Sequence, residues 1–170
     1  MFLTPNDFTV RSGELFRVNN QGYSFVFYFT TDCKWCDDVK PAFNYLSKMI
    51  RGVNFAYMDA KQNNWQVVKM SEQTRMPITY VPLLLLFGNG KPIGQYFPDE
   101  DNPQNNIPKM QNFIISNTRQ QNNQQVQSAS GSSNAPQKEE GPEIPPYSIG
   151  IPGNLASRKV CKLFDSAYNK

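Results

Sequence analysis

Two closely spaced cysteines are the side chains of this chain best suited to covalent chemistry. Cys33 and Cys36 are separated by two residues, and the third cysteine, Cys161, lies far along the chain. A Cys-x-x-Cys pair can exchange disulfides with other thiols, and no organic cofactor is needed because the pair itself carries the two electrons. The chain has no histidine, which excludes Ser–His and Cys–His catalysis. We therefore predict thiol–disulfide exchange with protein thiols and disulfides as partners.

A buried strand followed by a helix is expected to position the pair. Tyr23–Thr30 is a continuous aromatic and β-branched run, which is typical of a strand buried on both faces. From Cys36 the apolar residues recur at three- and four-residue steps, which indicates an amphipathic helix. These positions are Cys36, Val39, Phe43, Leu46 and Ile50, and Gly52 follows as a stop signal. Cys33 then lies at the helix N-terminus, where free N–H groups favour an anion, so we expect its pKa below the ~8.5 of a free thiol.

The two positions predict different roles. Cys33 is the attacking thiolate, and Cys36 is the more buried resolving thiol that releases the reduced partner. Lys34 favours a thiolate, whereas Asp32, Asp37 and Asp38 oppose it, and the sequence leaves the balance between them open. Asp37 and Asp38 can be charges that stabilise the helix start or catalytic groups.

Further periodic segments predict an α/β domain. Strands are expected at Val53–Asp59, Leu83–Phe87 and Ile93–Phe97, helices at Asn63–Gln73 and Ile107–Thr118, and a short element within Phe8–Val18. A strand–helix–strand unit implies parallel pairing, and the turn at 88–90 adds an antiparallel hairpin. The expected sheet is therefore mixed and flanked by helices.

Two motifs carry a family resemblance over about Leu15–Thr118. The stretch FVFYFTTDCKWCDDVKPAF resembles the active-site strand, Cys-x-x-Cys and kinked helix of thioredoxins and protein disulfide isomerases, with Pro41 matching the helix-kinking proline. Val81-Pro82 and the apolar run after it resemble the cis-proline strand of that family. The resemblance implies a thioredoxin-like fold, catalytic Cys33 and Cys36, and a partner peptide held at Val81 and Pro82.

The chain departs from the family pattern near the pair. Trp35 lies between the cysteines, where it can either contact partner peptides or pack over the disulfide. Phe27 and Phe55 stand where the family has a buried acid and the lysine that pairs with it. Without that acid, water or Asp37 is left as the base for the resolving thiol.

Composition divides the chain into three parts. Residues 1–118 form the predicted thioredoxin-like domain, 119–142 a low-complexity polar linker that we expect to be flexible, and 143–170 an extended tail with a C-terminal docking segment. Cys161, in the docking segment, is either an incidental thiol or a third redox partner. The Asn- and Gln-rich style is similar to that of thioredoxin-like proteins of large DNA viruses, which implies a virion-associated protein.

Composition also bounds the partners and leaves two alternatives open. The net charge of +3 is spread along the chain, so we expect no nucleic-acid partner, and the apolar run Val81–Phe87 is too short for a membrane span. Met1–Thr9 lacks the apolar core of a secretory signal, which favours a cytoplasmic, reducing compartment.

The Cys33–Cys36 pair could also be half of a zinc site, but such a site would need two further ligands. The main alternative is a non-enzymatic structural or interaction protein whose tail docks to a large assembly.

Overall fold

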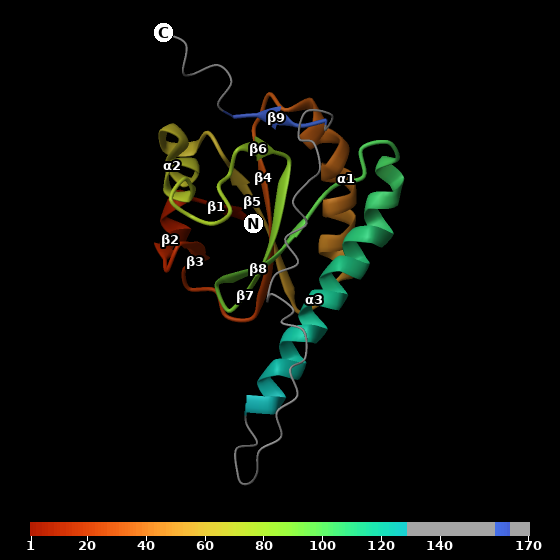
Figure 1. The fold of residues 1–170 in the computed structure, drawn as a ribbon. Coiled ribbons are helices and arrows are strands. Elements are labelled where there is room, and N and C mark those ends of the chain that lie inside the picture. The colour runs from red at the N-terminus through yellow and green to blue at the C-terminus, as the bar shows by residue number, and fades with distance from the viewer. Residues whose placement is uncertain (129–158, 164–170) are drawn as a thin grey trace, which may run out of the picture.

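A mixed five-stranded sheet forms the centre of the protein (Figure 1). The structure, a computed structural model, describes residues 1–128 and 159–163. The strands, in sheet order, are β1 (Phe2–Leu3), β5 (Val53–Asp59), β4 (Tyr23–Phe29), β7 (Leu83–Gly88) and β8 (Lys91–Tyr96). β1, β5 and β4 pair in parallel, whereas β7 pairs antiparallel with both β4 and β8. The predicted mixed sheet is confirmed.

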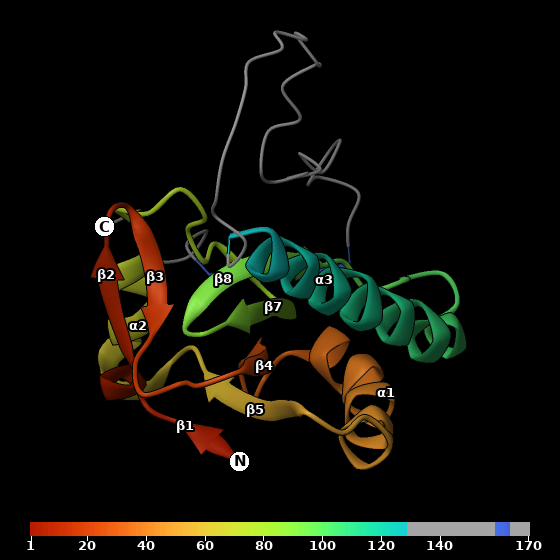
Figure 2. The same cartoon turned by 90° about the horizontal axis from the view of Figure 1, so that it is seen from below.

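Helices cover both faces of this sheet (Figure 2). Helices α1 (Lys34–Met49) and α3 (Asn106–Ser128) lie on one face. Helix α2 (Gln62–Ser71) lies on the other face with the hairpin of β2 (Phe8–Arg11) and β3 (Glu14–Arg17). Short 3-10 turns at Pro5–Asp7 and Pro103–Asn105 complete the domain. Among the described residues, no helix has the length and apolar character needed to cross a membrane.

The apolar run of β4 and the apolar stripe of α1, on either side of the cysteine pair, form the core. The interior of β4, from Phe25 to Tyr28, has no exposed surface, which explains its uninterrupted apolar sequence. On α1 the predicted stripe is buried from Cys36 to Leu46, and Pro41 lies within the helix. This packing holds the N-terminus of α1 at the end of β4.

A separate two-stranded pair lies at the same end of the sheet as the N-terminus of α1 (Figure 1). Its members are β6 (Tyr80–Val81) and β9 (Cys161–Lys162), which pair antiparallel. Strands β1, β6 and β9 were not expected from the sequence, because two-residue strands carry no readable period.

The last helix of the domain extends past residue 119, where the predicted linker begins. We expected the last helix to end at Thr118, but α3 continues to Ser128. Once buried Met110 and Ile114 anchor its first turns, each further residue adds a backbone hydrogen bond, and Gln is an adequate helix former. Residues 129–142 lie outside the described residues, and the division into three parts stays a prediction.

Candidate active site

The Cys-x-x-Cys pair lies at the junction of β4 and α1. Cys33 is the N-cap residue of α1, and its Sγ accepts a hydrogen bond from the backbone N–H of Cys36 at 3.3 Å. Both side chains are buried, with 1% of Cys33 and none of Cys36 exposed. The prediction that Cys36 is the more buried of the two thiols therefore corresponds to a difference of only 1% in exposure.

A segment much later in the sequence, at Val81 and Pro82, contacts the cysteine pair. The Val81–Pro82 peptide bond is cis, and the carbonyl oxygen of Val81 accepts a hydrogen bond from Cys33 Sγ at 3.7 Å. The architecture follows from the sheet order and from the position of Cys33 at the N-terminus of α1, the helix that follows central strand β4. The chain has a thioredoxin-like fold. This confirms the predicted fold class and the arrangement of Cys33 and Cys36 within it.

Comparisons with known proteins name no activity for the similar sequences. No family model matches the chain. It is 29% identical over 154 residues to the uncharacterized protein 196R of Invertebrate iridescent virus 6, covering 90% of this chain and 78% of that protein. It is 26% identical over 176 aligned positions to the uncharacterized protein 020R of Invertebrate iridescent virus 3, covering 99% and 95%.

Thioredoxins are among the solved structures that resemble the domain. Mitochondrial thioredoxin 3 of Saccharomyces cerevisiae has a TM-score of 0.41 at 21% identity, covering 51% of this chain and 74% of that one. Thioredoxin f of spinach chloroplast has a TM-score of 0.42 at 18% identity, with 56% and 72% covered. The fold assignment itself rests on the strand order and on the site geometry described above.

The protonation of Cys33 differs from the sequence-level prediction. The pKa of Cys33 is raised, first by its hydrogen bond with the Cys36 thiol and then by burial. Cys161 and the backbone N–H of Cys36 both lower the pKa, the latter as expected at a helix N-terminus, but the two raising effects outweigh them. The prediction of a Cys33 pKa below ~8.5 is therefore wrong for this closed, thioredoxin-like site. The sequence could not show how deeply the thiol is covered.

Charged residues around the pair are engaged in ion pairs at the surface. Asp32 pairs with Lys61 at 2.6 Å, and this contact holds the pKa of Asp32 below its usual value. Asp37 pairs with Lys40 at 2.7 Å and is largely exposed. The Asp37 carboxylate thus lies in a surface ion pair of the helix start.

The two phenylalanines at the family's acid and lysine positions belong to one aromatic cluster. Phe27 is fully buried, and its ring centroid lies 5.4 Å from that of Phe43 and 5.5 Å from that of Tyr57. Phe55 packs edge-on against Phe43 at 5.2 Å. Ring packing therefore fills the place of a buried acid–lysine pair, and no charge is left there without a counter-ion.

The predicted partner-binding residues gather around the cysteines. Pro82 is buried, and it lines a small cavity of about 20 Å³ together with half-buried Trp35. The Nζ of Lys34 lies 5.6 Å from the centroid of the Trp35 ring. That Trp35, Val81 and Pro82 contact a partner stays a prediction. Trp35 and Pro82 line one cavity, and the Val81 side chain is buried while its carbonyl contacts the Cys33 thiol.

Cys161 lies at this site, although the sequence left its role open. β9 places Cys161 opposite Val81, whose carbonyl accepts a hydrogen bond from the Cys33 thiol, and the thiols of Cys161 and Cys33 lie close enough to shift each other's pKa. Leu163 is buried against the core. The described part of the predicted docking segment, residues 159–163, therefore packs on its own domain, and the rest of that segment lies outside the described residues.

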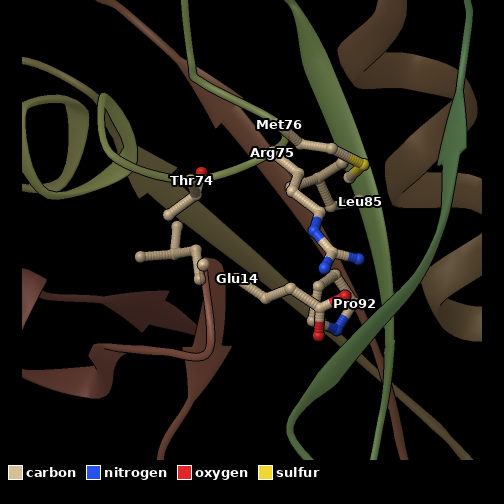
Figure 3. Close-up of a pocket in the computed structure, with 8 residues that line it drawn as sticks. Glu14, Thr74, Arg75, Met76, Leu85 and Pro92 are labelled. Atoms are coloured by element: carbon tan, nitrogen blue, oxygen red, sulfur yellow. The ribbon is translucent and has the colours of Figure 1, made fainter.

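A small apolar cavity elsewhere is separate from the thiols. It has a volume of about 30 Å³ and lies between the β2–β3 turn, the segment after α2, and strands β7 and β8. Figure 3 shows its lining, where the side chains of Glu14 and Arg75 reach toward Pro92. About one water molecule fills such a volume, so the cavity is too small for an organic substrate. Among the described residues, no group of three or more His, Cys, Asp or Glu side chains is arranged to hold a metal ion.

Proposed function

We propose that the chain is a thiol–disulfide oxidoreductase that acts on disulfides of partner proteins through Cys33 and Cys36. The contacts of Cys33 Sγ carry this proposal. The atom caps α1 and accepts the backbone N–H of Cys36 at 3.3 Å, so a thiolate formed there has a donor already in place. Cys36 lies one turn into the same helix, where it can attack a sulfur bonded to Cys33.

The reaction proceeds by two sulfur exchanges. The Cys33 thiolate attacks one sulfur of the partner disulfide, and the other partner sulfur leaves as a thiolate that takes a proton from solvent. Cys36 then loses its proton and attacks Cys33 Sγ, which forms the Cys33–Cys36 disulfide and releases the second partner sulfur. The partner gains two electrons and the cysteine pair loses two, and an external dithiol restores the reduced pair. The reverse sequence oxidises a partner dithiol.

Trp35, Val81 and Pro82 supply the partner surface in this proposal. The backbone of Val81 offers hydrogen-bonding groups to an extended peptide, as its pairing with β9 demonstrates within the chain. The Trp35 ring adds apolar contact beside Pro82. A peptide bound there brings its disulfide next to Cys33.

The burial of both thiols favours a second candidate, a redox-silent scaffold. Cys33 is 1% exposed and its pKa is raised, so the closed site holds little thiolate at neutral pH. In this candidate the thioredoxin-like domain is a structural or interaction module. Both named relatives are proteins of iridescent viruses, and a virion is therefore the assembly to test.

Insulin reduction with dithiothreitol as electron source separates the two candidates. We expect the full chain to accelerate insulin precipitation and Cys33→Ser to abolish the acceleration. The double variant Cys36→Ser, Cys161→Ser, which has no second thiol beside Cys33, should stop after the first exchange and retain insulin in a mixed disulfide, visible on a non-reducing gel. Ser47→Ala, a change of one atom at an exposed site on α1, is the control. A wild-type rate equal to that of Cys33→Ser would contradict the oxidoreductase and support the scaffold.

The reduction potential of the Cys33–Cys36 pair then gives the direction of electron flow. A value near the ~−270 mV of thioredoxin indicates a reductant, and a value near ~−120 mV indicates a strong oxidant. Equilibration with glutathione buffers followed by mass spectrometry measures it in the full chain.

A further inference from the structure

The C-terminal strand β9 lies across the cysteine site and is fixed by its backbone. Cys161 lies opposite Val81 and Lys162 opposite Tyr80 in an antiparallel pair (Figure 1). The backbone N–H of Leu163 donates to the carbonyl of Thr79 at 3.0 Å, which extends the pairing by one residue. β9 therefore occupies the edge of Val81 that would otherwise be free to hold another peptide.

Side-chain contacts fix β9 on both sides of Cys161. Before it, the backbone N–H of Lys159 donates to Glu100 Oε2 at 2.7 Å, and Lys159 Nζ lies 5.7 Å from the centroid of the Trp35 ring. After it, Leu163 is buried with 8% of its surface exposed. None of these contacts involves the thiol, so Cys161 is positioned by its neighbours.

The Cys161 thiol completes a cluster of three. It lies opposite Val81, whose carbonyl accepts a hydrogen bond from the Cys33 thiol at 3.7 Å, and it lowers the pKa of Cys33, while Cys33 raises the pKa of Cys161. Cys33 Sγ in turn accepts the N–H of Cys36 at 3.3 Å. All three cysteines carry free thiols, and Cys33 is linked to Cys36 directly and to Cys161 through Val81.

We propose that Cys161 is a third redox-active cysteine, which replaces Cys36 as the disulfide partner of Cys33. In the exchange, the Cys161 thiolate attacks Cys33 Sγ within the Cys33–Cys36 disulfide. The Cys33–Cys161 bond forms as the Cys33–Cys36 bond breaks, and Cys36 leaves as a thiolate. The proton of Cys161 passes to solvent, and Cys36 takes one up, so no net oxidation occurs. This inference rests on the proposed function, because a partner disulfide first oxidises the pair.

The exchange gives the chain two alternative disulfides with different consequences. With Cys33 bonded to Cys36, β9 is held by noncovalent contacts alone and a partner peptide can displace it from Val81. With Cys33 bonded to Cys161, β9 is locked onto Val81 and the site is closed to partners. Cys161 thereby takes the place that a thiol of a partner protein would otherwise occupy.

The ionisation of Cys161 is consistent with an exchange that begins from the oxidised pair. In the reduced cluster, the pKa of Cys161 is raised to about 12, first by burial and then by the hydrogen bond with Cys33 and the charge of Cys33. When Cys33 is in a disulfide it carries neither proton nor charge, so the two effects of Cys33 are gone.

Disulfide mapping of the full chain tests this inference. The protein is equilibrated with a series of reduced and oxidised glutathione mixtures, quenched in acid, alkylated and digested, and its disulfide-linked peptides are measured by mass spectrometry. We expect both Cys33–Cys36 and Cys33–Cys161 peptides in the wild type. In Cys36→Ser, Cys33–Cys161 should be the main disulfide. If Cys33 of Cys36→Ser carries glutathione at every ratio and never bonds to Cys161, the inference is overturned.

A second variant tests whether β9 holds Cys161 beside Cys33 or whether the two thiols meet by chance. Leu163→Ala keeps all three cysteines but weakens the attachment of β9, and it should lower the Cys33–Cys161 fraction several-fold while Cys33–Cys36 still forms. Met49→Ala removes an apolar side chain at a site that is 60% exposed, and it should match the wild type. An unchanged Cys33–Cys161 fraction in Leu163→Ala contradicts positioning by β9.

The same experiment distinguishes the two failures. If Cys33–Cys36 forms and reduces insulin but Cys33–Cys161 is absent from the wild type and from Cys36→Ser, only the inference fails. If no disulfide of Cys33 forms at any glutathione ratio in folded protein, the proposed function fails, and the inference fails with it.

Discussion

Cys161 lies opposite Val81 in the β6–β9 pair, and the carbonyl of the same Val81 accepts a hydrogen bond from the Cys33 thiol at 3.7 Å. One residue thus joins the C-terminal strand to the reactive centre. A change that loosens β9 should therefore alter the reactivity of Cys33, and a change at Cys33 should alter how β9 is held. The predictions below concern this coupling and the core that supports it.

Alkylation of Cys33 should be slow at neutral pH and should keep rising at alkaline pH. Because its pKa is raised, less thiolate is present at pH 7 than for a free thiol of pKa ~8.5, whose rate levels off above about pH 9.5. Iodoacetamide labelling of the reduced full chain between pH 6 and 11, read by peptide mass spectrometry, measures the profile. A Cys33 profile centred below pH 8 in the wild type would contradict the prediction.

The reduced protein should lose stability as the pH rises above about 8.5. The folded chain keeps protons on Cys33, on Cys161 with its pKa of about 12, and on Tyr28, whose pKa burial raises. The unfolded chain releases these protons near pH 8.5 for thiols and pH 10 for tyrosine, so it binds fewer protons and the free energy of unfolding falls. Urea unfolding in a reducing buffer at several pH values from 7.5 to 10.5 measures this loss. A free energy of unfolding that is constant over that range would be evidence against it.

Phe27→Asp should destabilise the domain by roughly 2–5 kcal/mol, because a carboxyl group would enter a fully buried site among aromatic rings without a partner. Phe27→Leu keeps the site apolar and should cost much less, so it is the matched control in urea unfolding. The rate of insulin reduction by folded Phe27→Asp then tests whether a buried acid at this position assists proton transfer. A higher rate than wild type shows that the missing acid limits catalysis, and an equal rate shows that it does not.

Tyr28→Phe should leave the protein as stable as wild type or more stable, by about 1 kcal/mol. The Tyr28 hydroxyl is buried and has no hydrogen-bond partner among the described residues, so its removal ends a desolvation cost. Tyr23→Phe is the comparison, because the Tyr23 hydroxyl donates to the Thr118 carbonyl at 3.0 Å and its loss should destabilise by about 0.5–1.5 kcal/mol. Chemical denaturation of the two variants side by side gives the difference. Equal losses in both would show that the Tyr28 hydroxyl is satisfied in solution.

The sequence by itself determined the elements that hold the cysteine pair. The apolar run of β4 and the three- and four-residue steps of α1 are local patterns, and burial of their apolar faces fixes where each element lies. β5 matches its predicted range, Val53–Asp59, because a seven-residue strand carries enough alternation to be read. The junction of β4 and α1, and with it the position of Cys33 and Cys36, follows from these patterns.

Only the tertiary structure decided what surrounds the pair. The two residues of β9 carry no readable period, and their pairing with β6 joins segments far apart in the chain. The raised pKa of Cys33 depends on burial and on the neighbouring thiol, which spacing at a helix N-terminus does not show. Local periodicity therefore placed the nucleophile, whereas long-range packing brought Cys161 to it and set its ionisation.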